Sequence, residues 1–534
     1  MASRFINEIN IITHMKKIIQ SFLLILFCTA ILGLSLRGIA GNPTSAVINQ
    51  PQWKEKGPFE LSPERGRFAL ALSMIENNSF FYSLPIARFA TPDLGFKDGN
   101  YVSLFAPGVS FLIIPGFWFG NMLGVGQVGA YAVIALFAFA NIFLLRSIAI
   151  KLGANSIAAT LGSLIFIFAT PAFAYGVNLY QHHISTFLIL SALFLLISRK
   201  GFISLTLIWF LLAASIPVDY PNLVLMAPIA IAALGKFVLV TKKEKLTNLT
   251  IKPLYIFSFI GVVIPLAFFM WFNFHSYGNP LQLSGTVAGV KAIDQYGKPT
   301  TPQGVDSNNA DSLLNPARQQ KSAIKFFQPR EMLNGFYIHF FSPDRGVIYY
   351  APVVLFGIAG ILLAIKKKLK MISVLVGIIG ANILLYSMWG DPWGGWAFGS
   401  RYLIPSYAIL SIFIALLLTY WKRKVIFLIP FLLVAFYSIA VNTLGAITTS
   451  AIPPQVQILS LEKISGIVQR YTYQRNWEFL LAGDSKSFVY QTFLSNYLSS
   501  VTFYILLTAL IFIVFGSIVF YYALISRRKE DENV

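Results

Sequence analysis

The chain has 534 residues, of which 56% are hydrophobic, 15% aromatic and only 12% charged. This composition excludes a soluble domain, which needs far less apolar sequence, and indicates a multi-pass membrane protein. The net charge of +20 falls in short basic clusters between apolar runs, which membrane topology explains better than binding to nucleic acid. The single cysteine, Cys28, excludes an intramolecular disulfide.

Apolar runs near the length that crosses a bilayer recur along the chain, and they are too long for strands of an outer-membrane barrel. The first run is interpreted as a retained anchor, because no clear small-residue cleavage site precedes Arg37. The predicted fold class is an all-α integral membrane protein with about 12 transmembrane helices and a long first outer loop that carries interfacial helices. The predicted spans are 19–36, 127–147, 155–175, 181–198, 201–217, 221–240, 252–273, 346–366, 371–389, 402–420, 424–446 and 501–525.

Seven basic clusters set the predicted orientation. Two crossings between successive clusters place both termini in the cytoplasm, which predicts a multi-pass protein of the plasma (inner) membrane. The clusters are Lys16 and Lys17; Arg146 and Lys151; Arg199 and Lys200; Lys242, Lys243 and Lys245; Lys366, Lys367, Lys368 and Lys370; Lys422, Arg423 and Lys424; and Arg527, Arg528 and Lys529.

The long connections then fall on the outer side, so the active site is expected to be extracytoplasmic. Residues 1–446 form the predicted transmembrane core, with outer loops 37–126 and 274–345. Residues 447–500 form a further outer loop, and 501–534 hold the last span and a cytoplasmic tail.

Residues 101–124, YVSLFAPGVSFLIIPGFWFGNMLG, are apolar enough to cross the membrane. A thirteenth span would reverse the alternation or place Arg146 and Lys151 outside. Prolines and glycines also interrupt the segment. We therefore predict an amphipathic or re-entrant piece at the outer interface.

The stretch SPERGRFALALSMIENNS, Ser62–Ser79, predicts an interfacial helix that presents its charges at the outer membrane surface. Pro63 suits a helix start, Glu64 sits in the first turn, and Phe68 and Leu72 recur at helical spacing. In one interpretation Glu64 only complements the helix macrodipole while the neighbouring arginines bind lipid headgroups. In the other, these charges belong to a site.

ERGRFALALSMIENNSFF, followed by Asp93 and by DGNYVSLFAPGVSFLIIP, resembles the first outer loop of C-type membrane glycosyltransferases, which use polyprenyl-phosphate sugars. In that family an acid in a pattern like acid-x-x-Arg-Tyr-Ala acts as the catalytic base. Glu64, Arg67, Phe68 and Ala69 match the pattern, with Glu where Asp is commoner. SLFAPG lacks the lysine often found before the proline pair of aminoarabinose-transferase relatives.

Further matching motifs follow in the expected order, and the last two resemble bacterial membrane proteins grouped with dolichyl-phosphate-mannose-type mannosyltransferases. All of them fall on the outer face in the topology that charge alone sets. Ionisable residues at membrane depth are costly, so their gathering on one face indicates a wet cavity. The motifs are the His182–His183 pair, VDYP with Asp219, FSPDRGVIYYAPV with Arg345, and WGDPWGGWAFGSRYLIP with Trp396, Arg401 and Tyr402.

The resemblance implies transfer of a sugar from a lipid phosphate. Arg401 or Arg345 would hold the donor phosphate, and Glu64 would accept the proton of the acceptor hydroxyl. Asp93 would orient the acceptor or a divalent cation, or be a turn residue; no metal-binding motif and no certain cofactor is recognised. The other residues assigned to substrate binding are Arg67, His182, His183, Asp219, Trp396 and Tyr402.

Several of these motifs have a second, structural interpretation. His182 and His183 would then only cap a helix at the interface. SPDRG would be a turn in which Asp344 and Arg345 pair with each other. The tryptophans of DPWGGWAFGSRY would be interface anchors and not platforms for a sugar.

The function predicted is an integral-membrane glycosyltransferase that acts on the extracytoplasmic side. Its partners would be a polyprenyl-phosphate-linked sugar donor, a lipid, glycan or protein acceptor, and membrane lipids, without nucleic acid. A flippase or transporter for a lipid-linked glycan is disfavoured, because it needs ionisable residues distributed through the bilayer. A catalytically inactive assembly protein of the same fold is the third alternative.

Overall fold

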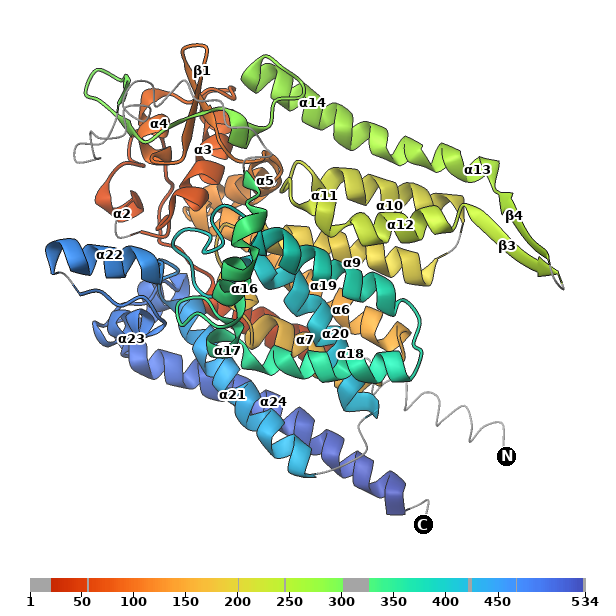
Figure 1. Cartoon of the computed structure of the whole chain (residues 1–534). Coiled ribbons are helices and arrows are strands. Elements are labelled where there is room, and N and C mark those ends of the chain that lie inside the picture. Colours follow the sequence, from red (N-terminus) through yellow and green to blue (C-terminus); the bar gives the residue numbers. More distant parts are fainter. Residues whose placement is uncertain are drawn as a thin grey trace.

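The computed structural model of the chain describes residues 21–54, 57–199, 201–243, 246–300, 326–420, 425–466 and 468–531. These residues are mostly helical (Figure 1). By length and composition, five described helices could cross a membrane: Gly126–Lys151, Pro253–Tyr277, Arg401–Tyr420, Phe427–Ile447 and Ser500–Leu524. A multi-pass membrane protein agrees with this finding, and the number of spans stays a prediction.

Shorter apolar helices account for much of the rest of the predicted core. They include Ser21–Ser35, where the first span was expected. The main described helices are α3 (Ser62–Glu76), α4 (Leu84–Ala90), α5 (Gly108–Met122), α6 (Gly126–Lys151), α7 (Ser156–Phe168), α8 (Ala172–Gly176), α9 (His182–Ser198), α10 (Phe202–Ser215), α14 (Val263–Tyr277), α16 (Met332–Phe340), α18 (Phe356–Lys366), α19 (Ile372–Ser387), α20 (Ile404–Tyr420), α21 (Val425–Ile447), α22 (Gln455–Ser465), α23 (Gln474–Leu481) and α24 (Ser500–Asp531).

The predicted span 221–240 is helical only as far as Gly235, and the described residues are mostly but not purely helical. Short helices α11 (Asn222–Leu225) and α12 (Ala227–Gly235) are followed by β3 (Val238–Lys243), which pairs antiparallel with β4 (Leu246–Ile251). The strands are rich in valine, threonine and isoleucine, whose branched side chains suit a strand. Two more small antiparallel sheets lie among the described residues. One has the order β2 (Asn100–Ser103), β1 (Leu94–Lys97), β5 (Ala288–Val290), and the other pairs β6 (Ala292–Ile293) with β7 (Pro299–Thr300).

The elements are sorted between two ends of the helical bundle (Figure 1). Helices α2 (Pro51–Lys54), α3 and α4 lie at one end, together with β1. The turn between α18 and α19, the β3–β4 hairpin and the C-terminal end of α24 lie at the other. Described basic residues expected on the cytoplasmic side therefore share one end, opposite the loops expected outside.

Helix α20 forms the centre of the bundle. Every side chain from Ile404 to Leu418 is buried, as expected of a helix with apolar residues on all sides. It packs against α18, α7 and α19. Because the short 3-10 turn Arg401–Leu403 leads directly into α20, Arg401 is fixed at one end of this central helix.

Helix α5 occupies the segment for which an interfacial placement was predicted. At its first residue, the Gly108 amide donates to the Pro217 carbonyl at 2.6 Å; after the helix, the Gly124 carbonyl accepts from the Gly41 amide at 2.7 Å. Pro217 ends the predicted span 201–217 and Gly41 lies in the first predicted outer loop; the interfacial placement of α5 stays a prediction. A Cβ added to Gly129 of α6 would lie 2.1 Å from the Gly116 carbonyl, so glycine is required for this close helix crossing.

A three-stranded sheet joins two loops that are far apart in the sequence. Strand β1 (Leu94–Lys97) pairs antiparallel with β2 (Asn100–Ser103) in a hairpin and, on its other edge, with β5 (Ala288–Val290). In the second pairing Leu94 faces Val290. The residues just outside this register, Asp93 and Lys291, are thereby brought together.

Candidate active site

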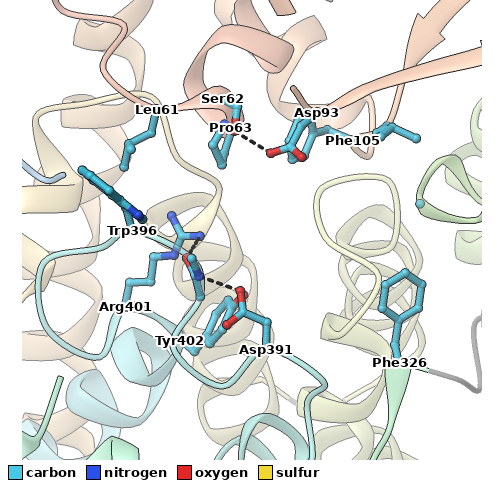
Figure 2. A pocket seen from close by; sticks show the side chains of 14 residues that line it. Leu61, Ser62, Pro63, Asp93, Phe105, Phe326, Asp391, Trp396, Arg401 and Tyr402 are labelled. Carbon is cyan, nitrogen blue, oxygen red and sulfur yellow. Dashed lines mark hydrogen bonds between the residues drawn. The ribbon is translucent and has the colours of Figure 1, made fainter. Parts of the chain in front are cut away.

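A pocket of about 450 Å³ lies between the first loop (residues 57–107) and the loop that precedes α20 (residues 391–402). Figure 2 shows Ser62 and Asp93 on one side of it and Asp391, Arg401 and Tyr402 on the facing side. The pocket is lined by Leu61, Ser62, Pro63, Asp93, Leu104, Phe105, Gly285, Phe326, Asp391, Gly394, Gly395, Trp396, Arg401 and Tyr402.

Arg401 is the cation of this pocket wall. Its side chain is only 8% exposed, and Nη2 donates to the Gly394 carbonyl at 2.6 Å. Nε and Nη1 have no hydrogen-bond partner among the described residues. A buried guanidinium without a carboxylate is costly, so Arg401 is a candidate ligand for an anion from outside the chain.

Glycines shape the loop that carries Arg401. Gly394 and Gly395 have φ of +71° and +63°, and Gly399 has φ of +59°, a region that glycine enters without strain. These glycines therefore permit a tight turn, in which the Gly394 amide donates to the Asp391 carbonyl at 3.1 Å. Asp391 closes the turn, because its carboxylate accepts from the Gly395 amide at 2.6 Å.

Asp93 is the first-loop carboxylate that reaches the pocket. Its Oδ2 accepts from Ser62 Oγ at 2.5 Å, and its Oδ1 lies 3.5 Å from Lys291 Nζ. The side chain is 34% exposed, so a ligand can contact it. The β1–β5 register supplies Lys291, and Pro63 at the start of α3 positions Ser62 opposite.

Glu64 does not lie at the surface, contrary to the prediction for the helix Ser62–Ser79. The helix forms at Ser62–Glu76, but Glu64 is fully buried and is absent from the pocket wall. One carboxylate oxygen accepts from the Leu61 amide at 3.2 Å, and Oε1 has no partner among the described residues. Burial, reinforced by the nearby Glu60, raises the pKa of Glu64 to about 7.

A polar layer lies beneath Arg401 and connects it to α3. The guanidinium groups of Arg401 and Arg67 lie 4.9 Å and 5.5 Å from the ring centre of Tyr180. Arg67 Nη2 donates to Gln181 Oε1 at 2.5 Å, and Gln181 Nε2 donates to Asp219 Oδ2 at 3.2 Å. Burial raises the pKa of Asp219. The predicted residues Arg67, Asp219 and Arg401 are thus brought together.

The two histidines have different surroundings. His182 stacks on Tyr180, with ring centres 5.9 Å apart and planes at 9°, and its Nε2 is without a partner in the described structure. His183 points to the helix packing: its ring bonds the Ala172 carbonyl at 2.7 Å. The geometry therefore joins His182 to the polar layer and gives His183 a structural contact.

Arg345 is a structural clamp. Its Nε donates to the Trp393 carbonyl at 3.0 Å, and its Nη2 donates to the Gly395 and Ile452 carbonyls at 2.8 Å each. Nη1 donates to the backbone carbonyl of Asp344 at 2.7 Å. Every guanidinium nitrogen is thus occupied, and the arginine fixes the loop 391–402 without facing the pocket.

Asp344 also has a structural role, although not the predicted side-chain pair with Arg345. Its carboxylate accepts from the Ser342 hydroxyl and, at 2.9 Å, from the Gln455 amide. Gln455 is the first residue of α22, where a negative charge is favourable.

Aromatic side chains complete the pocket wall. Tyr402 stacks on Tyr386 with ring centres 4.2 Å apart, and Trp396 donates from Nε1 to Gln457 Oε1 at 2.8 Å. Phe105 lies with Asp93 on the facing side (Figure 2), whereas Phe326 lies next to the Asp391 loop, where its carbonyl accepts from the Gly390 amide at 2.8 Å. The two predicted aromatic residues, Trp396 and Tyr402, therefore do line the site.

The sequence did not reveal a buried ionic network that lies beside the pocket. Glu60 lies 3.3 Å from Arg37 and 3.4 Å from Lys486 and accepts from the Ser450 amide at 2.9 Å. Burial would raise the pKa of Glu60, but Lys486 and Arg37 hold it below its ordinary value. Glu60 stands four residues before Glu64, but two of its partners, Ser450 and Lys486, lie about 400 residues along the chain. The pairing of Lys291 with Asp93 was not predicted either, because no pattern in the sequence around Lys291 indicates it.

Metal binding has no visible basis in the described part of the chain. No group of three or more histidine, cysteine or acidic residues that could hold an ion occurs there. Asp93 and Asp391 are the carboxylates of the pocket wall; Asp93 is paired with Lys291 and Asp391 with a backbone amide.

Comparison with known proteins gives two similar solved structures. Both are of ArnT from Cupriavidus metallidurans. The apo state shares 13% identity at a TM-score of 0.45, over 95% of this chain and 76% of that one. The form bound to undecaprenyl phosphate shares 12% sequence identity at a TM-score of 0.43, over 95% of this chain and 77% of that one. No family model matches the chain, and no curated protein does. Likeness at this level assigns neither activity nor substrate.

Proposed function

We propose that the chain is an integral-membrane glycosyltransferase that moves a sugar from a polyprenyl-phosphate carrier to an acceptor. The observation that carries the proposal is the buried Arg401, whose Nε and Nη1 lack partners among the described residues in a pocket that Asp93 also lines. A cation for the leaving phosphate and a carboxylate for the acceptor hydroxyl then face one another across a single pocket (Figure 2).

Arg401 would hold the donor phosphate. As the bond between the anomeric carbon and the phosphate oxygen breaks, its electron pair leaves with the phosphate, and fixed cations stabilise that charge. The free Nε and Nη1 form the planar fork that suits phosphate oxygens. Arg67, which contacts the same Tyr180 ring as Arg401, adds positive potential at the proposed phosphate site.

Asp93 would accept the acceptor proton. A general base must first be within hydrogen-bond reach of the hydroxyl, and Asp93 is the first-loop acid that lines the pocket. Ser62 and Lys291 hold its carboxylate in place. The acceptor oxygen then bonds to the anomeric carbon while its proton passes to Asp93.

Glu64 would influence this site electrostatically from its buried position beside the pocket. It lies in the electrostatic environment of Arg67 and Tyr180, so its ionisation changes the charge behind the phosphate site. Its pKa of about 7 makes this charge depend on pH near neutrality. We assign Glu64 as a positioning residue and Asp93 as the residue that contacts substrate.

The sugar and acceptor would bind between aromatic faces. Trp396 and Tyr402 on one wall and Phe105 on the other offer the apolar surfaces on which sugar rings stack. The carrier chain would lie along the apolar helices. In the proposed orientation the pocket is extracytoplasmic and the termini are in the cytoplasm of a plasma-membrane protein.

The test is release of carrier lipid from a panel of polyprenyl-phosphate sugars by the purified full chain in detergent. Asp93→Asn should abolish release, and Arg401→Gln should weaken donor binding. Asp98→Asn is the matched control, because Asp98 is an exposed turn residue of the same hairpin. Glu64→Gln should retain release but alter its pH profile.

Full release by Asp93→Asn together with loss of release by Glu64→Gln would reassign the base to Glu64. A wild-type chain that binds the carrier but releases nothing across the panel would favour the inactive assembly protein.

A further inference from the structure

A second cavity lies at the opposite end of the bundle, between the helix Ser21–Ser35, α7 and α24. Its volume is about 550 Å³, and its wall includes Arg146. None of its lining residues belongs to the candidate active site, so it calls for a separate explanation.

The wall of this groove is polar at one end and apolar at the other. Ser21 is the first described residue of one lining helix, Ser156 begins α7, and Tyr521 lies toward the end of α24. The lining residues farther from this polar end, Phe27 and Ala30 on the first helix and Leu510 on α24, are apolar. From Leu510 to Tyr521 the groove follows α24 for about 17 Å.

Arg146 marks the polar end. Its Nε donates to Thr160 Oγ1 at 2.9 Å and its Nη2 to Ser156 Oγ at 2.6 Å. No carboxylate within ion-pair distance of Arg146 occurs among the residues that the structure describes. Hydroxyl groups orient the guanidinium but leave its charge uncompensated, which is costly beside apolar surface.

The position of Arg146 along α6 fits the headgroup level of a bilayer. Twenty residues separate it from Gly126, where the helix begins, a rise of about 30 Å. This equals the thickness of the hydrocarbon core of about 30 Å. The neutralising anion is therefore expected in the headgroup layer, and the apolar part of the groove lies on the hydrocarbon side.

We propose that this groove binds one anionic phospholipid, with its phosphate on Arg146 and an acyl chain between the helix Ser21–Ser35 and α24. Both parts of the ligand follow from the wall: an unneutralised cation that is already oriented by Ser156 and Thr160, and an adjoining apolar channel. The site is independent of the proposed transferase activity.

The experiment is native mass spectrometry of the full chain in detergent, titrated with dioleoyl phosphatidylglycerol or dioleoyl phosphatidylcholine. These lipids share their chains and differ in headgroup charge. The wild type should bind phosphatidylglycerol more tightly than phosphatidylcholine. Arg146→Gln should lower that affinity about tenfold, the loss of one charge-assisted contact. Lys370→Gln is the matched control, an exposed lysine at the same end of the bundle.

A second variant tests the channel without touching the charge. Ala30 is exposed in the groove, so Ala30→Phe fills the channel and should reduce retention of both lipids. Unchanged phosphatidylglycerol binding by either Arg146→Gln or Ala30→Phe would overturn the proposal. Equal wild-type affinity for the two lipids would also overturn it, because an uncharged molecule or a segment of this chain would then be the occupant.

Discussion

Arg401 and Arg345 are both buried arginines near one loop, yet their hydrogen bonds differ completely. Arg345 donates from every guanidinium nitrogen to backbone carbonyls, whereas Arg401 leaves Nε and Nη1 unpaired among the described residues. Because buried polar groups are usually hydrogen-bonded, unpaired guanidinium nitrogens such as those of Arg401 indicate a missing ligand, whereas the fully paired Arg345 has a structural role. This difference in pairing favours Arg401 over Arg345 as the proposed phosphate ligand, a choice that the motifs alone left open.

Arg401→Lys is expected to weaken the binding of a free polyprenyl phosphate about tenfold, and Arg401→Gln about a hundredfold, because lysine keeps the charge but loses the planar fork. Thermal stabilisation by added polyprenyl phosphate measures both affinities. Arg345→Lys serves as the contrast: it should lower the melting temperature of the unliganded protein more than Arg401→Lys does, with little change in affinity. Unaltered binding by Arg401→Gln would contradict the assignment.

Glu64 should make stability depend on pH. Its pKa of about 7 lies above the value of about 4.3 in an unfolded chain. Between these values the unfolded state releases the proton first, so stability falls as pH rises toward 7 and is then constant. Glu64→Gln should remove this loss, with a melting temperature near that of the wild type at pH 4.5 and higher at pH 8. Parallel wild-type and variant profiles would refute the shift.

At the scale of elements, the first loop is tied to the loop after α21 by the Glu60 network. Arg37 and Lys486 both contact the Glu60 carboxylate, and Arg37 also donates to the Ala446 and Gly445 carbonyls. The loop that carries α3 is thereby fixed to segments more than 400 residues away. The pocket wall formed by Leu61, Ser62 and Pro63 depends on this attachment.

Glu60→Gln should destabilise the protein by about 3–5 kcal/mol, because removing one partner of a buried ionic network leaves uncompensated charge. Glu478→Gln is the control: Glu478 pairs with Arg470 where both side chains are 57% exposed, and such a surface pair contributes about 1 kcal/mol or less. Denaturation in detergent compares the two. Similar losses for both variants would show that the Glu60 network is not a structural attachment.

Local sequence patterns predicted local structure well. Pro63 and the spacing of Phe68 and Leu72 gave the start of α3 correctly, and His182 does begin α9. What failed was the environment of α3: a helix expected at the membrane surface is covered by neighbouring elements, so Glu64 is buried. Burial depends on packing partners that a single helix pattern does not specify.

Long-range pairing accounts for the parts of the site that the sequence did not reveal. Lys291 reaches Asp93 only because β5 pairs with β1. The sequence of residues 288–291 does not indicate that this segment pairs with residues 94–96. The β3–β4 hairpin was missed because a run of apolar residues was assigned to a span, although its valines and threonines also suit strands.

For the whole molecule, the separation of basic turns from the pocket predicts the orientation in the membrane. In a Cys28→Ser background, Asp98→Cys should react with a membrane-impermeant maleimide on intact cells. Lys370→Cys should react only after permeabilisation. Both positions are exposed, so accessibility within the protein does not limit either reaction. The reverse pattern would place the pocket in the cytoplasm.

The pairing of β1 with β5 has a mechanical consequence. Leu94 of the hairpin pairs with Val290 of the strand that follows α14, so a displacement of one of these strands would displace the other. Because Asp93 at the edge of this sheet and the loop 391–402 both line the pocket, a crosslink between the sheet and that loop is expected to fix the width of the pocket.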